Sequence, residues 1–446
     1  MQSTDGVARP DGKAAYRAQL LYFTAPPGPE PGDGSTVYVP DGLLVVERGH
    51  IVQLGDYRTE SSRLDDGVAV QDWRGKLIVP GFIDTHIHYP QTDIIASPAS
   101  GLLSWLETYT FPAERRFEDP AHAAQVAGFF LDELLRCGTT TALVYCTVHP
   151  GSAEALFAES HARNLRMVAG KVLMDRHCPE YLRDTAESGA LASEALIQEW
   201  HGRGRQMYAL TPRFAPTSTA AQLAVCGELA QRYDDVFIQS HVAENTQEVS
   251  WAMELFPGHR SYLAIYDHYG LLRRRAVYGH CIWMDDADRR RMHETGALAA
   301  HCPTSNLFLG SGLFDFAAAG ACRMPVALGS DVGGGTSFSM LQTMAAAHNV
   351  ARMSGHHLSA HRLFYLATEG AARALDLGGR IGTLAPGAEA DFIVLDPRAT
   401  PLLARRTARA ESLEELLFAL VMLGDDRAVA ATYSAGRLWH QRDGAD

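Results

Sequence analysis

The stretch Leu77-Ile-Val-Pro-Gly-Phe-Ile-Asp-Thr-His-Ile-His88 decides the fold, because it joins an apolar run to an HxH motif. The run 77–83 predicts a buried strand. Two histidines at i and i+2 of an extended segment share one face, so His86 and His88 can offer imidazole nitrogens to the same ion. The pair alone is a weak signal, since two histidines at this spacing often arise by chance.

Seven further apolar runs follow this stretch, with helix-like segments between them. That rhythm is typical of βα units and a parallel sheet. Segments 121–136 and 220–231, for example, carry apolar residues at helical spacing. Eight such units predict a (β/α)8 barrel, whose chemistry lies at the carboxyl ends of its strands. The eight expected strands are 77–83, 139–145, 166–174, 207–211, 236–240, 276–279, 297–300 and 326–329.

The two ends of the chain have a different pattern, with short alternating runs and turns rich in proline and glycine. Neither end is long enough to form a robust sheet core alone. We therefore expect both termini to combine into one small β-sandwich domain beside the barrel. The expected boundaries are 1–76 and 381–446 for the two parts of this domain, and 77–380 for the barrel.

Composition narrows the function classes. The 446 residues include 39 basic and 52 acidic side chains, which gives a formal charge of −13 and disfavours nucleic acid as a partner. No apolar run reaches the ~18 residues of a membrane span, and the first residues lack a signal-peptide pattern. Seven widely spaced cysteines without a CxxC pair argue against disulfides. We expect a soluble, cytoplasmic protein.

Ionisable residues fall at the ends of the predicted strands. His241 closes the fifth strand with Glu244 three residues later, His280 closes the sixth and Asp331 the eighth. In a barrel these positions converge with the HxH pair on one axial site. The two imidazoles of the HxH pair, a third imidazole and one carboxylate would form a ligand set suited to zinc, with one position left open for water. The joint placement is a strong signal, although each residue taken singly could be a buried polar group.

These residues carry a family resemblance. From about Pro80 to Met340 the chain resembles the amidohydrolase superfamily and, within it, the guanine deaminase branch. The HxH and Ser330-Asp331 motifs mark the superfamily, whereas the 103–114 block and the Pro212-Arg-Phe214 triplet point to the branch. The matching stretches are PGFIDTHIHYPQ at 80–91, LSWLETYTFPAE at 103–114, TPRF at 211–214, QSHVAEN at 239–245, HCPTSN at 301–306 and GSDVGGG at 329–335.

The resemblance implies a metal-dependent hydrolase of cyclic C–N bonds that converts guanine to xanthine and ammonia. It implies one zinc ion per chain, with iron as the alternative, and a homodimer. A second metal held by a carboxylated lysine is not expected, because strand four ends in Pro212-Arg-Phe214 and the nearest lysine, Lys171, lies on strand three. The implied metal ligands are His86, His88, His241 and Asp331.

Three catalytic roles are expected. Asp331 accepts the proton of the attacking water, His280 orients that water, and Glu244 carries a proton to N3 of the purine. Guanine has a carbonyl, O6, beside N1 and N7, so its pocket needs hydrogen-bond donors on that edge. The expected substrate contacts are Gln91 and Arg213 on this edge, and Phe214, Trp105 and Leu106 as walls.

Two alternatives stay open on the sequence. The first is an enzyme with the same metal chemistry that deaminates 8-oxoguanine, cytosine or an adenosine-like ring, or that dechlorinates a triazine. The second is a scaffold of this fold without catalysis, which is disfavoured because all five site positions are intact.

Overall fold

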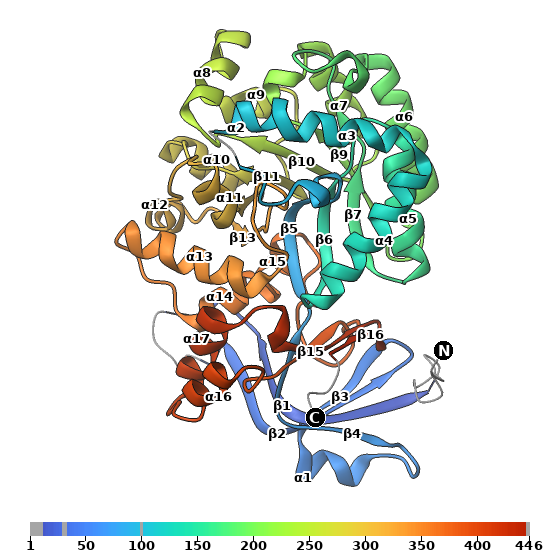
Figure 1. The fold of residues 1–446 in the computed structure, drawn as a ribbon, viewed down its shortest axis with the longest axis vertical. Helices are drawn as coiled ribbons and strands as arrows, with labels where there is room; N and C mark the ends of the chain where they lie inside the picture. Colours follow the sequence, from blue (N-terminus) through green and yellow to red (C-terminus); the bar gives the residue numbers. More distant parts are fainter. Residues whose placement is uncertain (1–11, 29–33, 99–100, 443–446) are drawn as a thin grey trace.

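The protein, described here by a computed structural model over residues 12–28, 34–98 and 101–442, forms a parallel barrel beside a mixed sheet (Figure 1). Neighbouring barrel strands pair in parallel, and β8 (Val172–Leu173) extends the pairing along β9. His88 donates its backbone N–H to Val332 at 2.8 Å, which joins the first strand to the segment after the last. In sheet order the strands are β5 (Phe82–His88), β6 (Thr139–Tyr145), β7 (Arg166–Gly170), β9 (Met207–Pro212), β10 (Phe237–Val242), β11 (Ala276–His280), β12 (Leu298–His301) and β13 (Val326–Leu328). The predicted (β/α)8 barrel is confirmed.

The barrel strands are buried on both faces, as expected of a parallel sheet covered by helices. Each strand contributes at least one apolar side chain to a packed layer inside the barrel, and β12 contributes two. This layer fills the interior, so the polar residues that follow it can gather only at the carboxyl ends of the strands. Its members on the strands are Ile83, Leu143, Val168, Ala209, Phe237, Val277, Leu298, Ala300 and Ala327.

Helices surround the barrel in the order of the βα units (Figure 1). Helix α4 shows why they form: the Asp119 side chain caps its first turn, Pro120 occupies the first position, and the buried face repeats at helical spacing from Ala123 to Leu135. The longer barrel helices are α4 (Pro120–Arg136), α5 (Pro150–Ala162), α6 (Ala186–Trp200), α7 (Ala220–Arg232), α8 (Thr246–Leu255), α9 (Tyr262–His268), α10 (Asp286–Thr295) and α13 (Met340–Met353).

Strands from both ends of the chain form the second sheet, as predicted for the fold class. All its pairs are antiparallel except β1 with β4. At the β15–β16 turn, Ala435 and Gly436 have φ of 47° and 73°, the left-handed pair that a tight hairpin requires. The sheet order is β16 (Arg437–Gln441), β15 (Val429–Ser434), β14 (Phe392–Leu395), β4 (Val70–Pro80), β1 (Lys13–Phe23), β2 (Thr36–Glu47) and β3 (His50–Asp56).

One predicted strand is wrong in its placement. The run 77–83 is divided: its first four residues end β4 in the mixed sheet, and the barrel strand begins only at Phe82. The break falls at Pro80-Gly81, where a Cβ on Gly81 would lie 2.2 Å from Oγ1 of Thr140. An apolar run carries no signal for such a change of sheet, because both halves are equally buried.

Helices α16 (Pro401–Thr407) and α17 (Leu413–Leu423) separate β14 from β15 and lie near α14 (Ala360–Leu366) (Figure 1). In the described part of the chain, none of the helices has both the length and the apolar character that crossing a bilayer demands.

Candidate active site

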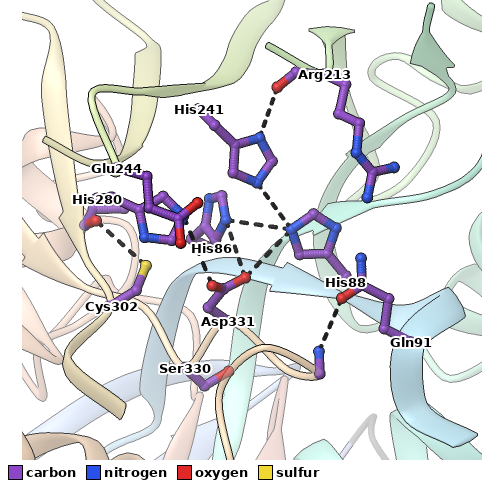
Figure 2. Close-up of polar contacts among 12 residues, drawn as sticks. His86, His88, Gln91, Arg213, His241, Glu244, His280, Cys302, Ser330 and Asp331 are labelled. Carbon is purple, nitrogen blue, oxygen red and sulfur yellow. Dashed lines mark hydrogen bonds and ion pairs between the residues drawn. The ribbon is translucent and has the colours of Figure 1, made fainter. Parts of the chain in front are cut away.

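Three imidazoles and one carboxylate meet at the carboxyl end of the barrel (Figure 2). Nε2 of His88 lies 3.3 Å from Nε2 of His86 and 3.2 Å from Nε2 of His241. Oδ1 of Asp331 lies 3.3 Å from Nε2 of both His86 and His88. The four ligand atoms are all within 4.8 Å of one another. The structure therefore brings together the four residues that the sequence predicted as metal ligands.

The protonation of these groups suits a divalent cation. Burial lowers the pKa of His88 to about 3 and that of His241 well below its usual value, so both rings are neutral. Burial alone would raise the pKa of Asp331, but the neighbouring imidazoles His86 and His88 hold it well below the usual value. Neutral rings at His88 and His241 and an ionised carboxylate at Asp331 are forms that bind metal.

The tautomer of His241 supports the same conclusion. Its Nδ1 lies 2.6 Å from the carbonyl oxygen of Arg213, which can only accept a hydrogen bond. Nδ1 therefore carries the proton, and the lone pair on Nε2 points into the cluster, as second-sphere contacts arrange in metal sites. Three ring nitrogens and a carboxylate oxygen at these separations fit one ion with mixed N/O ligands.

His280 lies beside this cluster. Its Nδ1 is 2.8 Å from Oδ1 of Asn306, and its Nε2 faces Oε2 of Glu244 at 3.5 Å and Oδ2 of Asp331 at 3.8 Å. The residue before it must be glycine, because a Cβ at Gly279 would lie 2.5 Å from Cε1 of His86. His280 thus stands between two carboxylates.

Glu244 is buried after β10, where its Oε1 accepts a hydrogen bond from Oγ of Ser311 at 2.8 Å. Its backbone N–H donates to Oε2 of Glu248 at 2.7 Å, so the capping box of α8 fixes the position of this loop. Burial and the charge of Asp331 raise the pKa of Glu244 to about 8. A carboxyl group with this pKa is largely protonated at neutral pH and can donate a proton.

A cavity opens beside the cluster at the carboxyl ends of the barrel strands. All five predicted substrate contacts line it: Gln91, Trp105, Leu106, Arg213 and Phe214. Sequence reasoning missed four other lining residues, which come from segments that fold over the barrel mouth. They are Leu102, Glu248, Leu309 and Gly334.

The cavity has two chemically distinct sides. In Figure 2 the guanidinium of Arg213 and the amide of Gln91 lie on the His88 side of the cluster, whereas Glu244 and His280 lie on the other. One side therefore offers hydrogen-bond donors to a ring edge, and the other offers a proton carrier.

Two residues considered from the sequence lie apart from the cavity lining. His301 is buried against Phe314 and Phe316, and burial lowers its pKa to about 3. Lys171 is buried, with Nζ 2.5 Å from Oδ2 of Asp184. This ion pair occupies the lysine, in keeping with a site for one metal.

The comparisons with known proteins agree with this geometry. Residues 77–439 match the model of the amidohydrolase family, and the chain belongs to that family. It is 47% identical to the guanine deaminase of Escherichia coli over 406 residues, which cover 91% of this chain and 92% of that protein. It is 34% identical to the guanine deaminase of Dictyostelium discoideum, over 90% of this chain and 94% of that one.

Solved structures give the same picture. The structure of the E. coli guanine deaminase superposes with a TM-score of 0.94 at 45% identity, covering 96% of this chain and all of that one. A guanine deaminase from C. acetobutylicum with guanine bound in its active site superposes with a TM-score of 0.86 at 27% identity, covering 96% of this chain and all of that one. The resemblance inferred from the sequence motifs is confirmed.

Proposed function

We propose that the protein is a guanine deaminase, which hydrolyses guanine to xanthine and ammonia. The observation that carries this proposal is the two-sided cavity, in which a metal-ligand cluster and Glu244 face a donor-rich edge made by Arg213 and Gln91. The high identity to guanine deaminases over nearly the whole chain supports it.

The metal we propose is one zinc ion, held by His86, His88, His241 and Asp331. Three nitrogens and one oxygen suit zinc, although iron binds similar ligands. When bound, such an ion lowers the pKa of a water molecule from 15.7 to about 7 and so makes hydroxide available near neutral pH.

The remaining steps belong to the chain. Asp331 takes the proton of the attacking water through Oδ2, which faces His280, while Nε2 of His280 orients that water. Glu244, protonated at neutral pH, donates to N3 of the purine as C2 becomes tetrahedral. The ionised Glu244 then takes the proton of the new C2 hydroxyl group and passes it to the amino group, so that the C2–N bond breaks, ammonia leaves and C2 becomes the carbonyl of xanthine. The proton held by Asp331 restores Glu244 to its protonated form.

Recognition of guanine follows from the other side of the cavity. Arg213 offers donors without any acceptor, and Gln91 offers both. These groups complement O6 and its neighbours N1 and N7. Phe214, Trp105 and Leu106 supply the apolar walls on which a purine ring packs.

The alternatives raised by the sequence are less well supported. A triazine or cytosine substrate would leave the Arg213 and Gln91 edge without a fused-ring partner, and a scaffold without catalysis would not need an intact ligand cluster.

We further propose a cytoplasmic homodimer without a nucleic-acid partner. The seven free cysteines support a reducing compartment such as the cytoplasm. The charge of −13 disfavours binding to nucleic acid, which is also negatively charged. Light scattering should give about twice the chain mass of 48.6 kDa.

The test is ammonia release from guanine, 8-oxoguanine, adenine, cytosine and melamine, with xanthine detection and metal analysis. We expect guanine-selective turnover with about one metal ion per chain, and loss of both in His86→Ala. The control is His357→Ala, an exposed histidine away from the cluster, which should retain both. Turnover of another ring only, or no bound metal, would contradict the proposal.

A further inference from the structure

We propose that Glu114 is a positioning residue that sets purine specificity, by holding Arg213 and Gln91 in one arrangement along the O6 edge. The inference rests on the proposed function and adds a residue that does not itself line the cavity. Glu114 acts through its two neighbours and does not contact the reacting atoms.

Glu114 is fully buried in α3 (Phe111–Arg115), directly after the π-helical turn η3 (Leu106–Thr110). Nη1 of Arg213 donates to both of its carboxylate oxygens at 2.8 Å. Nε2 of Gln91 lies 3.4 Å from the Oε1 of Glu114. One carboxylate therefore contacts both residues that we assign to the purine edge, although they lie on different strand ends.

The contact decides which donors of Arg213 remain for a ligand. A guanidinium has five N–H groups on three nitrogens, and Nη1 is the nitrogen that contacts Glu114. Within the described residues, Nε and Nη2 make no hydrogen bond, and the side chain is 3% exposed in the cavity wall. The ring of Phe111 lies 5.7 Å from the guanidinium carbon and limits its movement. Arg213 is therefore held with three free donors.

The same carboxylate fixes the amide of Gln91. An ionised carboxylate only accepts hydrogen bonds, so Nε2 must face Glu114, and Oε1 then accepts from the backbone N–H of Gly333 at 3.3 Å. The amide keeps one N–H and one lone pair for a ligand. Guanine presents the complementary pair at its six-membered ring, the acceptor O6 beside the donor N1–H.

Charge is the second consequence. Arg213 and Glu114 are both nearly inaccessible to water, and their pairing makes the edge neutral overall. Without Glu114 the buried guanidinium would lose its partner and turn toward other acceptors or water. The donors would then no longer be aimed at the O6 edge, while the apolar walls would be unchanged.

The competing interpretation is a purely structural ion pair that joins α3 to the end of β9. The two roles differ in a measurable way. A structural role affects all purines alike, whereas a positioning role affects only ligands that carry the 6-oxo group. Hypoxanthine and purine distinguish them, because neither has a 2-amino group to be released and only hypoxanthine has O6 and N1–H.

The experiment measures equilibrium dissociation constants of both ligands for the metal-loaded wild type and Glu114→Gln, together with kcat/KM for guanine. We expect hypoxanthine binding and kcat/KM to weaken about tenfold or more, and purine binding to change less than twofold, because charge-assisted hydrogen bonds are lost on one edge only. The matched control is Glu107→Gln, the same substitution at an exposed site in the same segment, which should leave all three values unchanged.

Equal weakening for hypoxanthine and purine would overturn the proposal in favour of a structural role. If Glu114→Gln does not fold, Glu114→Asp provides the same test, because it keeps the charge but moves the carboxylate back by one methylene. If that variant still discriminates between hypoxanthine and purine as well as the wild type does, the proposal is also overturned. In an Arg213→Met background, Glu114→Gln should change discrimination only through Gln91. Absence of guanine turnover by the wild type would refute the proposed function and this inference with it, whereas normal turnover with unchanged discrimination refutes the inference alone.

Discussion

Asp331 donates its backbone N–H to the carbonyl oxygen of His86 at 2.8 Å, so the first barrel strand and the segment after the last strand are joined at the ligand cluster itself. Oδ1 of the same aspartate lies 3.3 Å from Nε2 of the same histidine. The contact that closes the barrel therefore also holds two of the proposed metal ligands together. A change that separates these two residues should affect both stability and metal binding.

Removal of the metal should lower thermal stability. Without a cation, three buried imidazoles and a carboxylate face one another, and a ligand that binds only the folded state stabilises it by mass action. We expect a chelator to abolish activity and to lower the melting temperature by about 5–10 °C, with recovery on adding zinc but not magnesium. In His86→Ala the chelator should have little effect, and an equal fall in that variant would contradict a cluster-based explanation.

Gly279→Ala should weaken metal binding. The new Cβ would lie 2.5 Å from Cε1 of His86, so the ring must move away from the ligand cluster. We expect an affinity loss on the order of 10–100-fold, measured by competition with a chromophoric chelator. Gly320→Ala is the matched control, because a Cβ there meets nothing within 4 Å. Equal effects in the two variants would exclude the steric explanation.

Ser311→Ala should shift the pH profile of the reaction. Ser311 donates to Glu244 and so favours its ionised form; without this hydrogen bond the pKa of Glu244 rises further above about 8. In the proposed mechanism the protonated form donates to the purine, so activity should be lost as Glu244 ionises. The alkaline limb of kcat/KM should therefore move to higher pH, with little change at neutral pH, where Glu244 is already largely protonated.

The control is Ser250→Ala, which changes an exposed serine on α8, the helix after Glu244. This variant should leave the alkaline limb of kcat/KM in place. A limb that moves to lower pH in Ser311→Ala would show that Glu244 does not act as the acid.

Glu389→Gln should reduce stability in a pH-dependent way. Arg205 donates to Glu389 at 2.5 and 2.9 Å, and Arg166 donates at 3.2 Å. Burial alone would raise the pKa of Glu389, but the two guanidinium groups hold it below its usual value of 4.5. A lowered pKa in the folded state gives stability that is present above about pH 4.5 and is lost as the pH falls through the folded-state value.

We expect Glu389→Gln to cost about 3 kcal/mol at pH 7 and progressively less at acidic pH, measured by denaturant unfolding. Glu411→Gln, at an exposed position, should cost little at any pH. A deficit in Glu389→Gln that does not shrink below pH 4.5 would contradict the role of its charge.

The tertiary structure differs from the sequence-based predictions where local sequence patterns carry no information. The apolar run 77–83 looks like one strand, yet a change of sheet divides it at Gly81. Ser311 and Glu248 were not predicted at all, because their contacts with Glu244 join loops whose approach leaves no periodic signal in the chain. Glu114 was visible in a motif, but its contacts with Arg213 and Gln91 were not.

The sequence by itself determined the barrel and which ionisable residues gather at the carboxyl ends of its strands. Both depend on repeated features: apolar runs at regular intervals specify strands, and parallel strands bring whatever follows each of them to the same end of the barrel. Tertiary structure alone decided the tautomer of His241, the raised pKa of Glu244 and the pairing of Glu114. These properties depend on burial and on partners distant in the chain, and neither can be read from local sequence.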